Sequence, residues 1–151
     1  RLLSVNEIVD TWNITKNKLE NNYPEHHFIF TISPVRHLKD GFHENQLSKS
    51  TLHLAVNEIC KQNINCSYFP AYEIVIDELR DYSFFERDGV HPNRFCIEEV
   101  ATRFEQAFYL EDTKKVIEQY KDLKRMASHK HIHPGTLLFL QDHQILLFAI
   151  Q

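Results

Sequence analysis

The sequence predicts an α/β fold with a parallel sheet, of which these residues form about half. Helical and strand-like segments alternate in the order helix, strand, helix, strand, helix, which is typical of doubly wound α/β domains. The first strand-like segment is a short apolar run without polar alternation, as in strands that are buried on both faces. Because two strands are too few for a whole sheet of this class, we expect the sheet to be incomplete.

The composition is that of an ordinary globular chain. The 151 residues fit one domain with a sizeable core, since 42% of them are hydrophobic and only 25% are charged. A net charge of −4 gives no general attraction to nucleic acid or to anionic membranes, and no apolar run is long enough to span a bilayer. The three cysteines lack paired spacing, so we expect buried thiols in a reducing, cytoplasmic compartment.

The first expected element is an amphipathic helix over residues 4–20. Ser4 and Glu7 have the spacing of a capping box, in which each side chain bonds the backbone N–H of the other residue. Apolar residues then recur at helical spacing at Val5, Ile8, Val9, Trp12 and Leu19. Turn-forming residues at 21–24 end the helix.

The first expected strand covers residues 28–32, Phe-Ile-Phe-Thr-Ile, and Ser33-Pro34 ends it. In α/β folds ligands bind just beyond the carboxyl ends of parallel strands, so Ser33, Arg36 and His37 become candidates by position. We interpret Ser33 as a turn hydroxyl, because the sharp turn that presents a nucleophilic serine needs flanking glycines and here a proline follows.

The middle of the chain predicts a loop, a helix, a strand and a short helix. Residues 36–45 are polar and turn-rich, which is typical both of functional loops and of solvated connectors. Asn45 is the expected N-cap of a helix that residues 63–65 close, and its apolar face consists of Leu52, Ala55, Val56 and Ile59. Residues 66–69 predict the second strand, which Pro70 ends. Residues 72–80 predict a short helix with carboxylates on a solvated face.

Residues 88–93, Asp-Gly-Val-His-Pro-Asn, are the strongest candidate for chemistry. Asp88 precedes His91 by three residues, so its carboxylate can bond one ring nitrogen and leave the other nitrogen free. This is the base half of a nucleophilic hydrolase, in which His91 takes a proton and Asp88 fixes the tautomer. A merely local hydrogen bond is the alternative interpretation. We expect Pro92 in the first turn of the next helix and His91 in the loop before it.

Two more helices are expected, over residues 92–110 and 112–128, and the first of them has its apolar face at Ile97, Val100, Ala101, Phe104 and Phe108. The three glycines lie too far apart for a phosphate loop or a backbone oxyanion hole. His129, His131 and His133 alternate on one face of an extended segment, but the tract offers no fourth zinc ligand, so we expect neither metal nor cofactor.

Several blocks together resemble the GSCFA domain family of bacterial proteins. They are residues 31–37, Thr-Ile-Ser-Pro-Val-Arg-His, then Asp40-Gly41 and residues 45–49, Asn-Gln-Leu-Ser-Lys, and the segments at 68–73 and 77–82. Residues 88–93 are similar to the Asp-x-x-His-Pro block of the GDSL/SGNH hydrolase superfamily, of which the family is identified as a branch. The resemblance covers roughly residues 5–109, and the combined blocks are more specific than any single one.

The resemblance implies the C-terminal portion of a flavodoxin-like (SGNH hydrolase) three-layer α/β/α sandwich with a parallel sheet over residues 1–110, with a helix and an apolar tail, residues 111–151, packed on it. The implied activity is hydrolysis of ester bonds, for example carbohydrate O-acyl esters, with Asp88 orienting His91 as general base. The catalytic serine of such enzymes lies in a Gly-Ser-Cys-Phe-Ala segment, which these residues lack. Arg36, His37 and Asn45 match motif positions and are candidate substrate contacts.

Two other hypotheses stay open. The chain is alternatively a non-catalytic binding or assembly module, which uses the apolar tail and an uncovered sheet edge to bind a partner or a second copy of itself. The third hypothesis is metal binding through His129, His131 and His133, which the missing fourth ligand disfavours.

Overall fold

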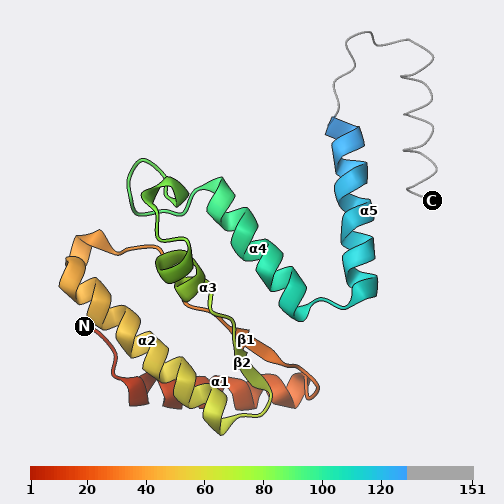
Figure 1. Ribbon diagram of the computed structural model, residues 1–151. Coiled ribbons are helices and arrows are strands. Elements are labelled where there is room, and N and C mark those ends of the chain that lie inside the picture. Colours follow the sequence, from red (N-terminus) through yellow and green to blue (C-terminus); the bar gives the residue numbers. More distant parts are fainter. Residues whose placement is uncertain (129–151) are drawn as a thin grey trace, which may run out of the picture. The chain divides into compact units, whose positions relative to one another are not determined.

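The computed structural model describes residues 1–128, which divide between two compact units, Arg1–Phe104 and the residues from Glu105 onward (Figure 1). In chain order the elements are α1 (Val5–Asn22), β1 (Phe28–Phe30), the 3₁₀ turn η1 (Leu38–Asp40), α2 (Phe42–Gln62), β2 (Cys66–Tyr68), α3 (Ala71–Glu73), the π-helical turn η2 (Ile74–Glu78), the 3₁₀ turn η3 (Tyr82–Phe84), α4 (Arg94–Phe108) and α5 (Glu111–Ser128). The described residues are thus helix-rich with a small parallel sheet, which agrees with the predicted α/β class.

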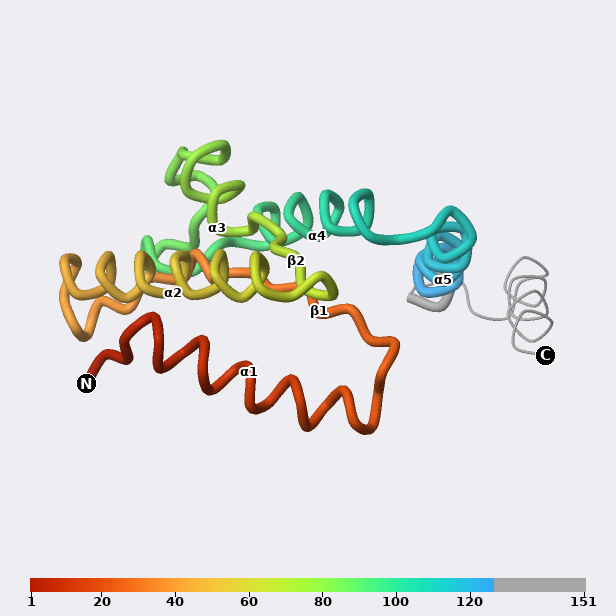
Figure 2. The backbone as a smooth tube through the Cα atoms, turned by 90° about the horizontal axis from the view of Figure 1, so that it is seen from below, coloured from red at the N-terminus to blue at the C-terminus, as the bar shows by residue number. Residues whose placement is uncertain are grey.

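Helix α1 begins as its sequence predicts. The Glu7 backbone N–H donates to Ser4 Oγ at 3.3 Å, and the Ser4 backbone N–H donates to Glu7 Oε2 at 2.8 Å, so the capping box is confirmed. The helix runs two residues further than expected and ends where the Tyr23 N–H bonds the Leu19 carbonyl at 2.8 Å. It lies alongside α2 (Figure 2), and Val9 is buried there in a cluster with Ala55, Ile59 and Cys66.

Strands β1 and β2 pair in parallel, in the register that puts Phe28 opposite Cys66 and Phe30 opposite Tyr68. The parallel pairing agrees with the prediction, but burial on both faces is wrong for β1, because Ile29 is 38% exposed. Successive side chains of a strand point to opposite faces. Phe28 and Phe30 share the face that α1 covers, where Trp12 meets both rings edge-on at centroid distances of 5.2 and 4.8 Å. Ile29 points to the opposite face, which is less covered.

Helix α2 begins earlier than expected, so the prediction of Asn45 as its N-cap is wrong. The cap residue is Gly41, whose φ of +92° is in the region that favours glycine, and Asn45 lies in the first helical turn. Its side chain is buried and accepts a hydrogen bond from the His37 backbone N–H at 2.9 Å. Asn45 therefore serves the preceding loop and not the helix end. The C-terminal cap at Asn63 and the buried face with Ala55, Val56 and Ile59 agree with the prediction.

Strand β2 stops before Pro70, and the short helix predicted after it is present as α3 and the wider turn η2. The Leu79 N–H bonds the Ile74 carbonyl at 2.8 Å, which closes that turn. Of the carboxylates expected on a solvated face, Asp77, Glu78 and Asp81 are exposed, whereas Glu73 is half-buried.

Helix α4 begins at Arg94, so Pro92 lies before its first turn and that prediction is wrong. Asn93 is the residue that caps the helix, because its Oδ1 accepts the Cys96 N–H at 3.1 Å. Pro92 instead forms an isolated antiparallel bridge with Phe85. Cys96 is fully buried in a second cluster with Val75 and Phe85.

The three cysteines are free thiols, of which Cys66 and Cys96 are buried and Cys60 is partly buried. Helix α5 has nearly the predicted bounds. None of the helices within residues 1–128 is both long and apolar enough to cross a membrane. The histidines at 129, 131 and 133 and the apolar tail lie outside the described residues, and no three potential ligand side chains gather at a metal-sized site inside them.

Candidate active site

Asp88 and His91 face each other across a tight turn. His91 Nδ1 lies 2.7 Å from Asp88 Oδ2, while Asp88 Oδ1 accepts the backbone N–H groups of Val90 at 2.8 Å and of His91 at 3.0 Å. One carboxylate oxygen, Oδ1, therefore stabilises the turn, and the other, Oδ2, binds the imidazole. The His91 Nε2 atom has no hydrogen-bond partner within residues 1–128, so it is available to a reactant.

The pair is exposed to solvent, and its hydrogen bonds keep Asp88 ionised. The side chains of His91 and Asp88 are 60% and 48% exposed. The hydrogen bond from His91, helped by the two backbone N–H groups, lowers the pKa of Asp88 to about 2. Asp88 is therefore an ionised acceptor throughout the physiological range, and this charge favours a proton on the imidazole nitrogen that faces it.

The turn itself is tied at its base. The Glu86 N–H bonds the His91 carbonyl at 2.8 Å, and the Gly89 N–H bonds the Glu86 carbonyl at 2.9 Å. Gly89 has a φ of +65°, in the left-handed region that side chains other than glycine rarely adopt. Asn93 links the turn to η3, since its N–H bonds the Phe84 carbonyl at 2.9 Å. These local bonds explain why His91 lies in a loop directly before α4.

The three candidate substrate contacts lie in different environments. Arg36 reaches the turn, where its Nη1 donates to the Gly89 carbonyl at 3.1 Å. The His37 side chain is exposed, and only its backbone N–H is bound, to Asn45. Asn45 is buried. The structure thus brings Arg36 to the Asp88–His91 turn, while Asn45 fixes the backbone of the segment that carries Arg36.

Lys49 is a buried residue that the sequence reasoning missed. Lys49 is only 3% exposed, and its Nζ donates to the Ser33 carbonyl at 2.5 Å. Burial lowers the pKa of this ammonium group. A signal was present: Asn45 and Lys49 continue the apolar face of α2 toward its N-terminus at the same helical spacing, which marks them as inward-facing.

An apolar cavity of about 280 Å³ opens beside the turn. It begins at Pro92, next to His91, and its walls are formed by the strand-end segment, α3, η2 and α4, at Pro34, Ala71, Val75, Pro92, Cys96, Ile97, Val100 and Ala101. Because these side chains are almost wholly apolar, the cavity offers burial to an apolar group and few partners to a polar one.

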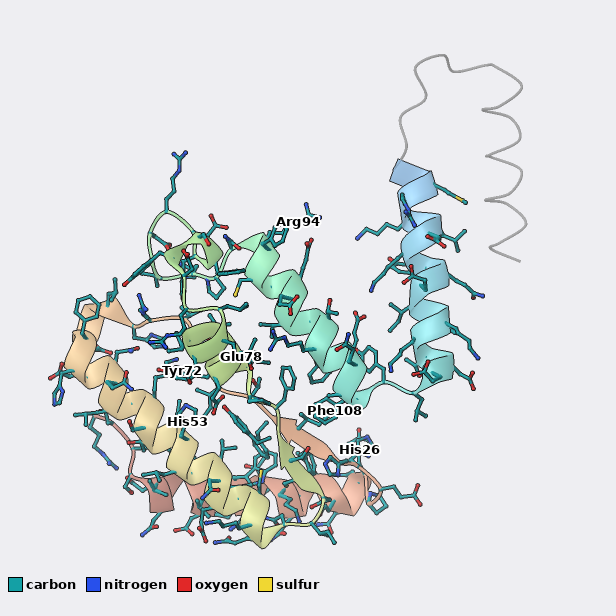
Figure 3. The ribbon with its side chains drawn as sticks, viewed as in Figure 1. His26, His53, Tyr72, Glu78, Arg94 and Phe108 are labelled. Carbon is teal, nitrogen blue, oxygen red and sulfur yellow. The ribbon has the colours of Figure 1, made fainter. Side chains whose placement is uncertain are left out.

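A second polar cluster lies between α2 and α3. The Tyr68 hydroxyl donates to Glu73 Oε2 at 2.7 Å, and His53 Nδ1 lies 3.6 Å from Glu73 Oε1. Figure 3 shows His53 beside Tyr72, and their ring centroids are 4.9 Å apart. Burial and the nearby Glu73 carboxylate raise the pKa of Tyr68. This cluster shares no residue with the Asp88–His91 turn, and its bonds join β2, α2 and α3.

Comparison with known proteins identifies one family. The family model of the GSCFA family matches residues 1–104, which is more than half of the chain and contains the whole Asp88–His91 turn. None of the curated proteins and none of the solved structures matches.

Proposed function

The chain belongs to the GSCFA family, and we propose that it is the C-terminal part of an SGNH/GDSL-like hydrolase that acts on ester bonds. The observation that carries this proposal is the 2.7 Å contact between Asp88 Oδ2 and His91 Nδ1, with Nε2 left available. An oriented imidazole beside an ionised carboxylate is what a hydroxyl nucleophile needs as its base.

The proposed reaction has two steps. His91 Nε2 takes the proton of a serine hydroxyl, the serine oxygen attacks the ester carbonyl, and the alcohol leaves with the proton from His91. Water then attacks the acyl-serine and gives its proton to His91, which returns it to the departing serine oxygen, and the acid is released. Asp88 stays ionised and stabilises the imidazolium in both steps. The serine belongs to a Gly-Ser-Cys-Phe-Ala segment outside these residues.

The proposed parent fold is a three-layer α/β/α sandwich in which β1 and β2 are two strands of a larger parallel sheet. The partly exposed Ile29 and the apolar cavity beside the turn support it, because both are surfaces that further strands and helices would cover. Carbohydrate O-acyl esters are the proposed substrates. The exposed His37 side chain is the candidate contact with them.

A fluorophosphonate probe tests this function on the full-length protein. We expect the probe to label one serine, and we expect His91→Ala to slow labelling about a hundredfold or more, since the base and nucleophile act as a unit. His26→Ala is the matched control, because His26 is exposed and its ring lies tilted against that of Tyr23, away from the Asp88–His91 turn in sequence. Labelling of the His91→Ala protein at the control rate would contradict the proposal.

The second candidate function is a binding or assembly module. It is favoured by the exposed apolar side chains of Phe95 and Ile97 at the start of α4, beside the apolar cavity. In that case no serine reacts with the probe, and Ile97→Asp changes the sedimentation coefficient of the full-length protein by dissociating an assembly.

A further inference from the structure

We propose that Arg36 is a positioning residue, which holds the turn that bears Asp88 and His91 in its paired geometry, and that it does not act by contacting substrate. The inference rests on the proposed function and deepens it, since it names the residue that sets the orientation of the general base.

Three contacts place Arg36 on the turn. Its Nη1 donates to the Gly89 carbonyl at 3.1 Å, across 53 residues of sequence. Its guanidinium carbon lies 5.2 Å from the centroid of the Phe85 ring and 5.8 Å from that of Tyr82. A guanidinium held over aromatic rings and bonded to a carbonyl has few orientations left. Arg36 therefore joins the tip of the turn to the residues at its base.

The turn needs such a support because its own side chains bury little. Asp88 and His91 are both exposed, and no heavy atom beyond Gly89 and its two chain neighbours lies within 4 Å of the position that a Cβ would take on Gly89. The geometry of the pair then depends on the backbone, because Asp88 Oδ1 must stay within reach of the Val90 and His91 N–H groups. The Gly89 carbonyl is the point at which a residue from outside the turn fixes that backbone.

Arg36 is itself anchored to the core. The Ser33 carbonyl accepts the bond from buried Lys49, and Asn45 accepts the N–H of His37, so both ends of the segment that carries Arg36 are tied to α2. The Val35 N–H also bonds Ser33 Oγ at 3.2 Å. Helix α2 thus holds residues 33–37 in place, and Arg36 in this segment holds the turn through its bond to the Gly89 carbonyl.

Amide hydrogen exchange in the full-length protein tests the inference without using activity. We expect Arg36→Ala to speed exchange of the Val90 and His91 amides by about fivefold or more, because a bond from a charged donor is lost. Arg36→Lys should restore part of the protection. The control is Arg87→Ala, which removes the same charge from an exposed position in the same loop and should change these rates less than about twofold.

One further readout, the titration of Asp88, separates positioning from structural or substrate roles, and a second variant stands by for Arg36→Ala. The carboxyl pKa of Asp88, followed by NMR, should rise from about 2 in Arg36→Ala, since loosened N–H groups stabilise the carboxylate less. If Arg36→Ala does not fold, Tyr82→Leu takes its place, because Tyr82 is exposed and its ring is one of the two beneath the guanidinium. It should give a smaller change in the same direction.

The outcomes distinguish this inference from the proposed function. Unchanged exchange and unchanged Asp88 titration in a folded Arg36→Ala or Tyr82→Leu protein would overturn the inference, even where His91→Ala abolishes serine labelling. A raised KM for the ester with unchanged exchange would also overturn it, because that pattern assigns Arg36 to the substrate. Faster exchange without any labelled serine would support the positioning role while the hydrolase function fails.

Discussion

Two hydrophobic clusters within the unit Arg1–Phe104 border cavities of different character. The first is built by α1, α2 and the sheet, and there the rings of Phe28 and Phe30 close around Trp12. The second, built by η2, η3 and α4, contains Val75, Phe85 and Cys96 and borders the cavity of about 280 Å³. The first cluster also borders an open groove, between α1 and α2, but polar residues such as Asn6, Asp10 and Lys61 form most of its lining. The cavity beside the second cluster is almost wholly apolar.

The candidate site lies beside the second of these clusters. Phe85, a member of the second cluster, pairs with Pro92 at the base of the Asp88–His91 turn, and Pro92 also lines the cavity. The site thus lies beside the apolar cavity, while the segment that carries Arg36 is bonded to α2 through Lys49 and the Ser33 carbonyl.

Ile59→Ala gives the largest expected effect on this comparison. Ile59 is almost fully buried in the first cluster, so truncation should cost about 2–5 kcal/mol of unfolding free energy through lost burial and a cavity. Chemical denaturation measures this loss. Leu54→Ala on the same helix is the control, because Leu54 is exposed and its removal should cost less than about 0.5 kcal/mol. Equal losses in both variants would contradict the burial of Ile59 in the first cluster.

Asp88→Asn gives the next effect, which depends on pH. The folded pKa of Asp88 is about 2, below the ordinary value near 4, so its stabilising contribution is present above pH ~4 and is lost as pH falls through about 2. The thermal midpoints of wild type and Asp88→Asn should therefore converge as pH falls from 5 toward 2, as melting curves at successive pH values would show.

Glu7→Gln in α1, which packs on the first cluster, is the variant matched to Asp88→Asn. Hydrogen bonds from the Arg1 side chain and from Ser4 lower the pKa of Glu7 to about 2 as well. We expect the same convergence there. If only Glu7→Gln shifts the midpoint, the Asp88 turn opens before the rest of the chain unfolds, and the contrast between the two clusters becomes sharper.

Local chemistry made part of the fold predictable. The capping box of Ser4 and Glu7 and the turn of Asp88 and His91 each involve residues three apart, so the spacing predicts that the two side chains of each pair can meet. The parallel pairing of the two strands followed from the alternation of helix and strand.

The errors arose where a contact beyond the range of local capping patterns decides. Asn45 is in sequence a good N-cap, but its side chain accepts the N–H of His37 in the preceding loop, eight residues earlier. Pro92 fits a first helical turn, but pairing with Phe85 holds it outside the helix. The bond between Arg36 and Gly89 spans 53 residues, and only the three-dimensional structure reveals it. The catalytic roles of Asp88 and His91 stay a prediction.

Ile97→Ala gives the smallest expected effect and tests the apolar cavity beside the second cluster. Ile97 belongs to the predicted apolar face of α4, yet it is 58% exposed and lines the cavity. In a chain whose cavity stays open, truncation should change the unfolding free energy by less than about 0.5 kcal/mol, measured by chemical denaturation of residues 1–151. Under the proposed three-layer fold, in which further elements bury this face, the same substitution in the full-length protein should cost more, about 1–3 kcal/mol. Equal small losses in both proteins would show that nothing covers the second cluster, and would leave the cavity for a ligand or a partner.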